Sequence, residues 1–410
     1  MRIAIQKFGG TSLATSDLRL RVCDIISATR SKGLSVVVVV SAIGRKQNPY
    51  ATDTFINLVK EINSYPSPRE MDLIMSCGEV ISGVLLSNQL CATGIETKFL
   101  TGGQAGIITD GNYGSAHILY VNPRNVLNCL ENNIVPVIAG FQGMGENGEL
   151  TTLGRGGSDT TASALGVALN AEVVDIFTDV EGVMTADPRI VENARLLDAI
   201  TYNEICQLAR DGAKVVHPRA IEIAMQGAIP LRVRSTFSDS LGTLVTNHLN
   251  GSNETVRIIR DCLITGITYT SNIAQIRLNM GIIQEQKGIS LKVFKSLADV
   301  DISVDFINVQ PEHIMFTVPS DSALKATKVL QDSGFSPDVT LECAKVAVVG
   351  AAMTGIPGVM AKVVEALSEK DIPILQSGDS YTNIWCLVKR EHMEDAVKVL
   401  HDKFELGKKI

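Results

Sequence analysis

The second half of the chain repeats itself, and this repeat constrains the fold more than any other feature of the sequence. When the chain is shifted by about 70 residues, HIMFTV falls on NIWCLV and one KVL triplet falls on another without a gap. Identical residues coincide in the same register in the pairs Gly288 and Gly358, Lys292 and Lys362, Val293 and Val363, Leu297 and Leu367, Asp301 and Asp371, and Ile302 and Ile372. The strand and helix signals that share this register predict two small βαββαβ modules in tandem.

Both modules have a feature that suits a small ligand. In each copy the loop before the first helix ends in a glycine, Gly288 or Gly358. Backbone N–H groups at a helix N-terminus are free to bind an amino-acid carboxylate. We therefore expect an effector site at the interface between the modules; the alternative is a duplicated scaffold without a ligand.

The first half of the chain alternates short β-branched runs with amphipathic stretches. SVVVVVSA precedes TFINLVKEI, VPVIAGF precedes GSDTTASALGVAL, and EVVDIFT precedes a helical pattern around Tyr202 to Arg210. Such alternation predicts βαβ units, with a parallel or mixed sheet between helices on both faces. The Gly-, Ser- and Asn-rich stretch from Phe237 to Glu254 is typical of a linker. We therefore predict a first domain over residues 1–245 and two modules over residues 256–337 and 338–410.

Composition and charge narrow the class of partner. The chain has 410 residues and a formal charge of −7, and its lysines and arginines are dispersed, which argues against nucleic acid. The longest apolar run, Val36 to Val40, is too short to cross a membrane, and the N-terminus lacks a signal-peptide pattern. We therefore expect small-molecule partners, no membrane association and a cytoplasmic location.

The cysteines and histidines give little support to a metal site. The eight cysteines lie far apart without a CxxC pair, which is typical of reduced, mostly buried thiols. The six histidines are scattered and HExxH is absent. His217, in KVVHPRA, is most simply a structural or capping residue.

Two glycine-rich stretches have the character of anion sites. In KFGGTS a strand-like run delivers Lys7 into Gly9 and Gly10, where backbone N–H groups can approach a phosphate closely. The alternative is a tight turn. In TTLGRGGSDTTA three glycines open a loop, Arg155 offers a bidentate fork, and Ser158 and Asp159 stand at the N-cap of a helix expected over Thr160 to Leu169. Its alternative is a plain helix cap beside a surface arginine.

Further polar groups follow predicted strands or interrupt an apolar helix. SCGEVIS places Glu79 among small residues, where it could receive a substrate ammonium; a solvated helix glutamate is the alternative. Ser41 ends a buried strand, and a long loop after it carries Thr52 and Asp53, at the edge of an open α/β sheet where ligands bind. The loop in IFTDVEGVMTADPR suits a nucleotide, and a surface Asx turn is its alternative; it carries Thr178, Asp179, Glu181 and Asp187.

Together these motifs carry a family resemblance. In the order KFGGTS, SCGE, TLGRGGSDTTA, FTDVEGVMTADPR and AKVVHPRA they resemble the aspartokinases of the amino-acid kinase superfamily, and the repeats look like ACT modules. The resemblance runs from Met1 to about Leu406. GRKQNPYATDT, FTDVEGVMTADPR and IPILQSGDS are most similar to the diaminopimelate-responsive type of this family in bacilli. The implied fold is an α/β protein, with a three-layer αβα kinase domain followed by two tandem ACT modules.

The resemblance implies an ATP-dependent kinase that phosphorylates the side-chain carboxylate of L-aspartate. The product, 4-phospho-L-aspartate, would be the first intermediate toward diaminopimelate, lysine, threonine and methionine. The carboxylate is already an anion at neutral pH, so the reaction needs no general base. Mg²⁺ would be held mainly by the nucleotide. The sequence has neither GxxxxGK[ST] nor GxGxxG, so a P-loop or Rossmann phosphate site is not available for the same task.

The resemblance also implies a role for each motif residue. Lys7 would neutralise the phosphates, and Asp159 would orient Lys7. Arg155 and Ser158 would grip the substrate α-carboxylate and Glu79 its α-ammonium, with Ser41 and Thr52 near the reacting end. The implied substrate set is completed by Gly156 and Gly157. The implied nucleotide set is Lys7, Phe8, Gly9, Gly10, Thr178, Asp179, Met184, Asp187, Arg189 and Lys214.

Two positions depart from the pattern of the family. Met184 stands where many relatives carry an aromatic residue, so stacking on a base is not expected there. In the first module Lys287 replaces the proline of an acidic-x-Pro-Gly loop, whereas the second module keeps Pro357 and Gly358. An added cation favours an effector with an added carboxylate, so we expect meso-diaminopimelate, with lysine or threonine as alternatives. We also expect a homodimer formed through the ACT modules, because exposed sheet edges are usually covered.

Two other functions remain open from the sequence. The first is a superfamily member with another acceptor, such as glutamate, acetylglutamate, carbamate or UMP, although Glu79 with Arg155 favours a free α-amino acid. The second is a non-catalytic amino-acid sensor built on the ACT modules. Lys7, Arg155 and Asp159 argue against a dead kinase, and aspartate-dependent ATP turnover would separate the two classes.

Overall fold

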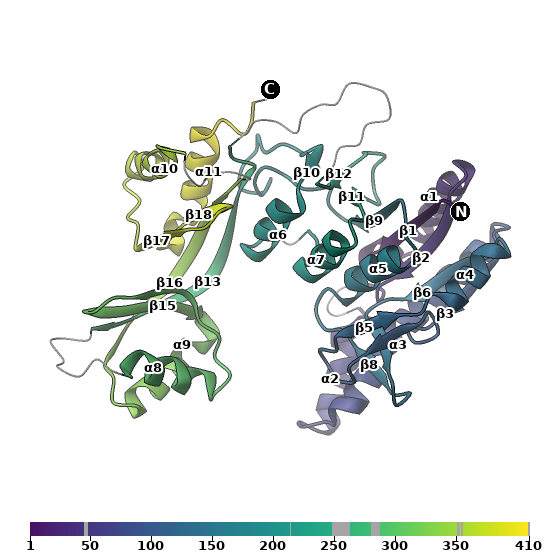
Figure 1. Ribbon diagram of the computed structural model, residues 1–410, viewed down its shortest axis with the longest axis horizontal. Coiled ribbons are helices and arrows are strands. Elements are labelled where there is room, and N and C mark those ends of the chain that lie inside the picture. The colour runs from purple at the N-terminus through teal and green to yellow at the C-terminus, as the bar shows by residue number, and fades with distance from the viewer. Residues whose placement is uncertain are drawn as a thin grey trace. The chain divides into compact units, whose positions relative to one another are not determined.

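The computed structural model describes residues 1–44, 48–213, 215–247, 263–279, 288–350, 353 and 356–408, which form two compact units (Figure 1). The first unit contains Met1–Val183, Leu196–Ala209 and Lys214–Asp261, and the second contains Met184–Arg195, Arg210–Ala213 and Cys262–Ile410. The predicted first domain, residues 1–245, is therefore interrupted twice: two short segments, 184–195 and 210–213, belong with the C-terminal unit.

The first unit is built on an eight-stranded sheet in the order β10-β12-β11-β9-β1-β2-β6-β3. Its neighbouring strands are parallel except for β11 and β12, which confirms the predicted mixed sheet. The Val-rich run predicted as a buried strand is β2, whose valines are buried on both faces. The strands are β1 (Ile3–Phe8), β2 (Ser35–Val40), β3 (Thr97–Leu100), β6 (Val135–Ala139), β9 (Val173–Thr178), β10 (Ala199–Ile200), β11 (Leu231–Ser235) and β12 (Thr243–Val245).

Helices cover both faces of this sheet, which confirms the three-layer αβα architecture. On one face α1 (Ser16–Ser31) and α3 (Pro68–Ala92) pack their Val22, Ile26 and Leu86 onto Phe8 and the valines of β2. On the other face Gly166 of α5 (Gly157–Ala168) lies against Ile5 and Val174. The remaining helices of this unit are α2 (Thr52–Ile62), α4 (Arg124–Glu131), α6 (Tyr202–Arg210) and α7 (Pro218–Gln226).

A small second sheet was not anticipated from the sequence. It contains β5 (Ile118–Val121), β4 (Ile107–Thr109), β7 (Gln142–Gly145) and β8 (Leu150–Thr152) in that order. These strands are only three or four residues long, too short for a periodic pattern to stand out. The sheet matters for function because β8 leads directly into the glycine-rich stretch at 154–157.

The stretch predicted as a linker contains a strand. Residues 243–245 form β12, which pairs antiparallel with β11 and parallel with β10. Loop-forming residues surround this short strand and mask it in the sequence. Residues 248–254 of the predicted linker lie outside the described part of the chain.

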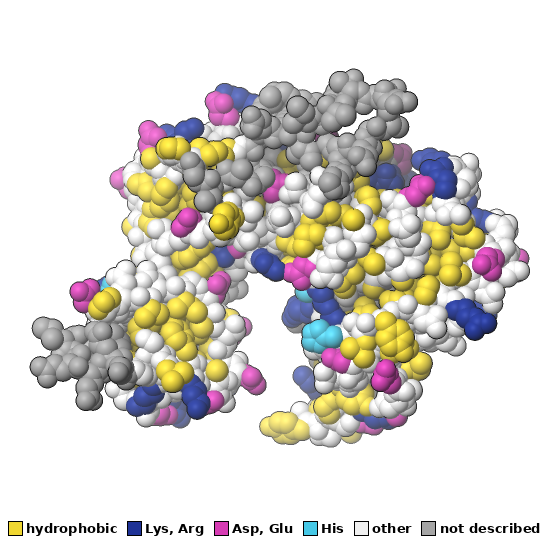
Figure 2. Space-filling model, viewed as in Figure 1, with side chains coloured by type: hydrophobic (Ala, Val, Ile, Leu, Met, Phe, Trp, Pro, Cys, Tyr) yellow, Lys and Arg dark blue, Asp and Glu magenta, His cyan; other side chains and the backbone are white. Residues whose placement is uncertain are grey.

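Among the described helices α3 alone is long and apolar enough to cross a membrane by length and composition. Its buried side includes Leu86 and Leu90, which belong to the core under the main sheet, together with Asp72 and Glu79. We therefore treat α3 as a core helix. On the face shown in Figure 2 acidic and basic side chains are interspersed.

The second unit is a six-stranded antiparallel sheet with helices, in the order β14-β15-β13-β16-β18-β17. The predicted register of the repeat reappears in the backbone: Gly288 and Gly358 are left-handed N-caps (φ 92° and 93°), and Asp301 and Asp371 both have positive φ (58° and 54°). The elements are β13 (Gly266–Asn279), α8 (Ile289–Ala298), β14 (Asp305–Val309), β15 (His313–Pro319), α9 (Ser320–Asp332), β16 (Pro337–Val349), α10 (Val359–Ser368), β17 (Gln376–Asp379), β18 (Asn383–Lys389) and α11 (Met393–Lys403).

The two repeats share their longest strands. The second half of β13 pairs with residues 337–340 of β16, whereas its first half, from Gly266 to Thr270, pairs with residues 345–349. The second repeat thus takes its fourth strand from residues 266–270, the beginning of the predicted first module. The two repeats therefore form one continuous sheet. The boundaries 256–337 and 338–410 stay a prediction.

Candidate active site

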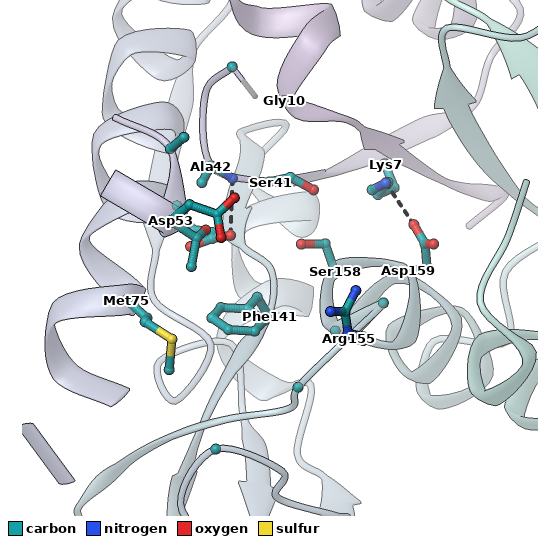
Figure 3. Close-up of a pocket in the computed structure, with 18 residues that line it drawn as sticks. Lys7, Gly10, Ser41, Ala42, Asp53, Met75, Phe141, Arg155, Ser158 and Asp159 are labelled. Atoms are coloured by element: carbon teal, nitrogen blue, oxygen red, sulfur yellow. Dashed lines mark hydrogen bonds and ion pairs between the residues drawn. The ribbon is translucent and has the colours of Figure 1, made fainter. Parts of the chain in front are cut away.

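The first unit contains a cavity of about 570 Å³ at the carboxyl ends of β1, β2 and β6, the edge where open α/β sheets bind ligands (Figure 3). Most of the residues predicted for the substrate and for the phosphates meet there. The lining residues are Lys7, Gly10, Ser41, Ala42, Gly44, Ala51, Thr52, Asp53, Met75, Glu79, Gly114, Phe141, Gly154, Arg155, Gly156, Gly157, Ser158 and Asp159.

Because side chains alternate between the two faces of a strand, the side chain of Lys7 points toward α5. Phe8 faces the core under α1 and α3, so Lys7, one residue earlier, points to the opposite face. There its Nζ lies 2.7 Å from Oδ1 of Asp159, and both side chains are only about one-eighth exposed (12% and 13%). The pair holds a cation at one end of the cavity, as Figure 3 shows.

Helix α5 begins at Gly157, three residues earlier than predicted, and its N-cap is Gly156. Gly156 has a left-handed backbone (φ 67°), and a Cβ on it would collide with His217. Ser158 and Asp159 therefore do not cap the helix; they lie in its first turn and line the cavity. The Gly157 N–H donates to Gly154 O (3.0 Å). The positive end of the helix dipole at this terminus suits a carboxylate or a phosphate.

Glu79 is buried rather than solvated. It is 3% exposed, its Oε1 accepts a hydrogen bond from Ala42 N (3.0 Å), and its Oε2 has no hydrogen-bond partner among the described residues. Burial raises the pKa of Glu79 to about 8, against the opposing effect of the Ala42 N–H. A buried carboxylate with one free oxygen is a receptor for an ammonium group.

The remaining wall comes from the ends of β2 and α2. Ser41 follows β2, and its hydroxyl points toward that of Ser158 (Figure 3). Thr52 and Asp53 are not in a long loop, as predicted, but in the first turn of α2. Gly10 contacts the 42–44 segment so closely that a Cβ would collide with Ala42 O, and Gly10 O accepts a hydrogen bond from Gly44 N (3.0 Å).

Phe8 and Gly9, which the resemblance placed in the nucleotide site, lie outside the cavity lining. Phe8 is fully buried and stacks on Phe177 with ring centroids 4.7 Å apart, so its side chain belongs to the core and not to a nucleotide site. Gly9 N donates to Phe177 O (3.2 Å), so this N–H is already used and is not a free phosphate donor. Of the two glycines, only Gly10 faces the cavity.

The predicted nucleotide loop is divided between the two units. Thr178 and Asp179 belong to the first unit and lie outside the cavity lining. The second unit holds the half-buried Met184 together with Asp187 and Arg189. The carboxylate of Asp187 accepts a hydrogen bond from Arg189 N (2.9 Å), as in an Asx turn, and a second from the Arg189 guanidinium. Tyr269 O–H donates to the same carboxylate (3.1 Å). Arg189 lowers the pKa of Asp187, chiefly by side-chain hydrogen bonding.

Of three further predictions, only the one for His217 falls on a described residue. Lys214 lies outside the described residues, as does Lys287. His217 is the N-cap of α7, where its Nδ1 accepts from Arg219 N (3.3 Å), which confirms the capping interpretation.

Some lining residues were missed from the sequence. Phe141 follows β6 with a left-handed backbone (φ 68°), and Met75 and Gly114 come from α3 and from the loop between β4 and β5. The position of Phe141 at the end of a buried strand was a usable signal, because that edge of the sheet binds ligands. Nothing local marks Met75 or Gly114.

The arrangement defines a class of protein. A cation, a helix N-terminus and a buried carboxylate converge on one cavity, and the described lining contains no serine or cysteine hydrogen-bonded to a base. Such a set suits transfer of a phosphoryl group to an anionic acceptor. A family model described as "Amino acid kinase family" matches residues 2–235, and an ACT domain model matches residues 339–402. The chain belongs to the amino acid kinase family.

Relatives specify which amino acid kinase this is. The chain is 50% identical over 408 residues to "Aspartokinase 1" of Bacillus subtilis (strain 168), covering 100% of both chains, and 40% identical over 419 residues to an aspartokinase of Thermus thermophilus, again covering 100% of both. The solved structure of E. coli aspartokinase III in complex with aspartate and ADP matches with a TM-score of 0.80 at 27% identity, covering 98% of this chain and 99% of that one. The chain is an ATP-dependent aspartate kinase, a phosphotransferase with a carboxyl group as acceptor.

Proposed function

We propose that the cavity of the first unit is where this chain phosphorylates the side-chain carboxylate of L-aspartate. Lys7, held by Asp159, neutralises charge on the transferring phosphoryl group, and Gly10 approaches the same phosphates. The α-ammonium of aspartate binds Glu79, and its α-carboxylate binds Arg155, Ser158 and the backbone at Gly156 and Gly157. The Gly157 N–H is already bonded to Gly154 O (3.0 Å), so Gly157 contributes close backbone approach and not its N–H group. Ser41 and Thr52 lie near the reacting end of the substrate.

The reaction then depends on position and charge. An oxygen of the aspartate carboxylate attacks the γ-phosphorus, the bond from that phosphorus to the bridging oxygen breaks, and ADP leaves. No proton has to move, because the nucleophile is already an anion. The protein supplies preorganised positive charge where negative charge accumulates, and this is the main catalytic device available to phosphoryl transferases.

One observation carries this proposal. The buried Glu79 oxygen without a partner and the exposed Arg155 fork line the same cavity as the Lys7–Asp159 pair. A site with a carboxylate at one point and a guanidinium at another fits a free α-amino acid better than an acetylated or nucleotide acceptor. The E. coli structure with aspartate and ADP shows that a relative of this fold binds both ligands.

We further propose that Mg²⁺ enters with the nucleotide phosphates. Among the described residues no group of three or more His, Cys, Asp or Glu side chains could hold a metal. From the family resemblance, the residues proposed to contact the nucleotide are Thr178, Asp179, Met184, Asp187, Arg189 and Lys214. Seven described cysteines are free thiols, which supports a reducing compartment such as the cytoplasm.

The experiment is an ATP-consumption assay with L-aspartate in which hydroxylamine traps the acyl phosphate. We expect an aspartate-dependent hydroxamate, and Arg155→Ala should raise the KM for aspartate with a smaller change in kcat, because Arg155 contacts a remote carboxylate in ground and transition states alike. No hydroxamate from folded protein with Mg²⁺ present would contradict the kinase assignment and favour a sensor.

We propose meso-diaminopimelate as the effector at the ACT modules and a homodimer formed through them. Lys287 adds a cation to the first module that would suit the second carboxylate of diaminopimelate. A second solved structure of E. coli aspartokinase III, in complex with lysine and aspartate, shows that a relative binds lysine (27% identity, TM-score 0.76). Inhibition of the hydroxamate assay by diaminopimelate but not by lysine is the expected result, and inhibition by lysine alone would contradict it.

A further inference from the structure

Asp72 is a buried carboxylate that the proposed roles do not use. It lies in α3, is 0% exposed and does not line the cavity. Its oxygens accept hydrogen bonds from Gly114 N (2.9 and 3.0 Å), from Thr152 N (2.7 Å) and from Thr152 Oγ1 (2.8 Å). Burying a carboxylate is costly unless donors replace the lost water, and here those donors come from two distant parts of the chain. Asp72 therefore ties these two segments to α3.

Both segments form the cavity wall. Gly114 lines the cavity itself, and Thr152 ends β8 just before Gly154 and Arg155. The segments are also bonded to each other, since Ala116 N donates to Thr152 O (2.9 Å). Because these two segments are held in place, the position at which the 154–158 loop begins is also held.

Arg219 holds the same two segments from α7. Its Nη1 donates to Leu153 O (2.9 Å) and its Nη2 to Ala116 O (2.8 Å). The planar fork of a guanidinium sets two acceptors at a defined separation, which a lysine cannot do. Asp72 thus accepts hydrogen bonds from the N–H groups of these two segments, and Arg219 donates hydrogen bonds to their carbonyl oxygens.

Helix α3 carries Asp72 and Glu79 on one buried face. Seven residues are about two turns, so the two carboxylates lie roughly 10 Å apart along the helix and point the same way. One rigid helix therefore determines both the position of the ammonium receptor and the position of the loop that carries Arg155.

We propose that Asp72 and Arg219 are positioning residues for aspartate. They hold the loop with Arg155 and Ser158 at a set distance from Glu79, so that the α-carboxylate and the α-ammonium of one substrate are gripped together. This inference rests on the proposed roles of Glu79 and Arg155 in the cavity.

The test compares Asp72→Asn with the wild-type chain in the hydroxamate assay. An asparagine turns one acceptor into a donor that faces backbone N–H groups, so the loop shifts. Because misplacement by about 1 Å can cost about 100-fold, we expect the KM for aspartate to rise by about 10- to 100-fold while the KM for ATP stays unchanged. Arg155→Ala, measured in parallel, should show the same split.

The matched control is Asp175→Asn. Asp175 is equally buried (1% exposed) and pairs with Arg232 (2.6 Å) in the main sheet, but it has no bond to the loop. It should lower stability without changing the KM for aspartate. If Asp72→Asn does not fold, Arg219→Lys, which keeps the charge and loses the fork, should give the same split between the two KM values.

Three outcomes would overturn the inference. Equal rises in both KM values, or an effect no larger than that of Asp175→Asn, would show a purely structural role. An unchanged KM for aspartate in Arg155→Ala would remove the reason to position the loop. A wild-type chain that forms no hydroxamate would instead count against the proposed function itself, and the inference would fall with it.

Discussion

Glu79 enters the interior of the first unit with one oxygen bonded to Ala42 N and the other without a hydrogen-bond partner among the described residues. The sequence left both burial and solvation of this side chain open, because a glutamate in a helix is normally solvated. The small residues around it, Ser76, Gly78, Ser82 and Gly83, are the local signal for a closely packed helix face, and all are buried.

The raised pKa of Glu79 predicts a pH dependence of aspartate capture. Since burial raises this pKa to about 8, the free enzyme carries mostly neutral Glu79 below that pH, whereas an ammonium needs the carboxylate. We therefore expect kcat/KM for aspartate to rise as the pH increases toward about 8. In Glu79→Gln kcat/KM should be low at every pH and this rise should vanish; a wild-type profile that is flat through this range would contradict the assignment.

The same shift has a consequence for stability. The pKa of Glu79 in the folded chain, about 8, lies above the ordinary 4.5, so the folded state binds more protons between these values. The contribution of Glu79 to stability is therefore present below 4.5 and declines as the pH rises toward 8. Glu79→Gln should gain stability relative to wild type across this window, measured by denaturant unfolding at several pH values.

At the scale of elements, helix α5 and its glycine N-cap decide the geometry of the site. The sequence placed Ser158 and Asp159 at the cap, but the left-handed Gly156 lets the helix start at Gly157, which brings both side chains into the cavity. The preference of helix N-caps for serine and aspartate predicts the start of a helix from side chains alone. Here the start is set instead by a left-handed backbone conformation that is available mainly to glycine.

Gly156→Ala should therefore damage both stability and function. The left-handed backbone costs a non-glycine residue about 1–2 kcal/mol, and the added Cβ collides with His217. We expect a lower free energy of unfolding and a raised KM for aspartate. Gly33→Ala is the control, because Gly33 is also left-handed (φ 78°) but has no atom within 4 Å of its Cβ position. Equal effects of the two variants on the KM would contradict the role of the α5 terminus.

Other elements show which features of the fold could be predicted from the sequence. Helix α6 spans Tyr202–Arg210 as predicted, and the repeat correctly predicted matching caps at Gly288 and Gly358. Asp72 escaped prediction because its partners lie 42 and 80 residues away, and no local pattern reports such contacts. The shared strand β13 escaped for the same reason, since a tandem repeat does not reveal which copy a strand pairs with.

At the scale of the whole molecule, the chain leaves the first unit at 210–213 and contributes Asp211 to the second. Asp211 is buried there, 2.5 Å from Lys345 Nζ, and it accepts from Asn383 Nδ2 (2.7 Å). The ammonium of Lys345 also lies 4.2 Å from the centre of the Phe306 ring, which stacks on Trp385. This buried pair joins a segment between α6 and α7 to the ACT sheet.

Asp211→Ala should destabilise the second unit selectively. The change removes the buried carboxylate of Lys345 and leaves its ammonium with only the exposed Asp305 carboxylate, 4.0 Å away. Breaking a buried ion pair costs at most about 3–5 kcal/mol. We expect one unfolding transition to move and the other to stay in a denaturant titration followed by two probes, Trp385 fluorescence for the second unit and ligand protection for the first. Glu172→Ala, which breaks the exposed pair with Arg2, should change little. A uniform shift of both transitions would argue against two independent units.

We propose above that Lys7, paired with Asp159, supplies the charge that phosphoryl transfer to aspartate requires. The most direct measurement is kcat for aspartate-dependent hydroxamate formation by Lys7→Ala, with an unchanged circular dichroism spectrum as proof of folding. Loss of a preorganised cation at the transferring group predicts a fall in kcat of about 10²- to 10⁴-fold. Near-complete turnover by the folded variant would contradict the account.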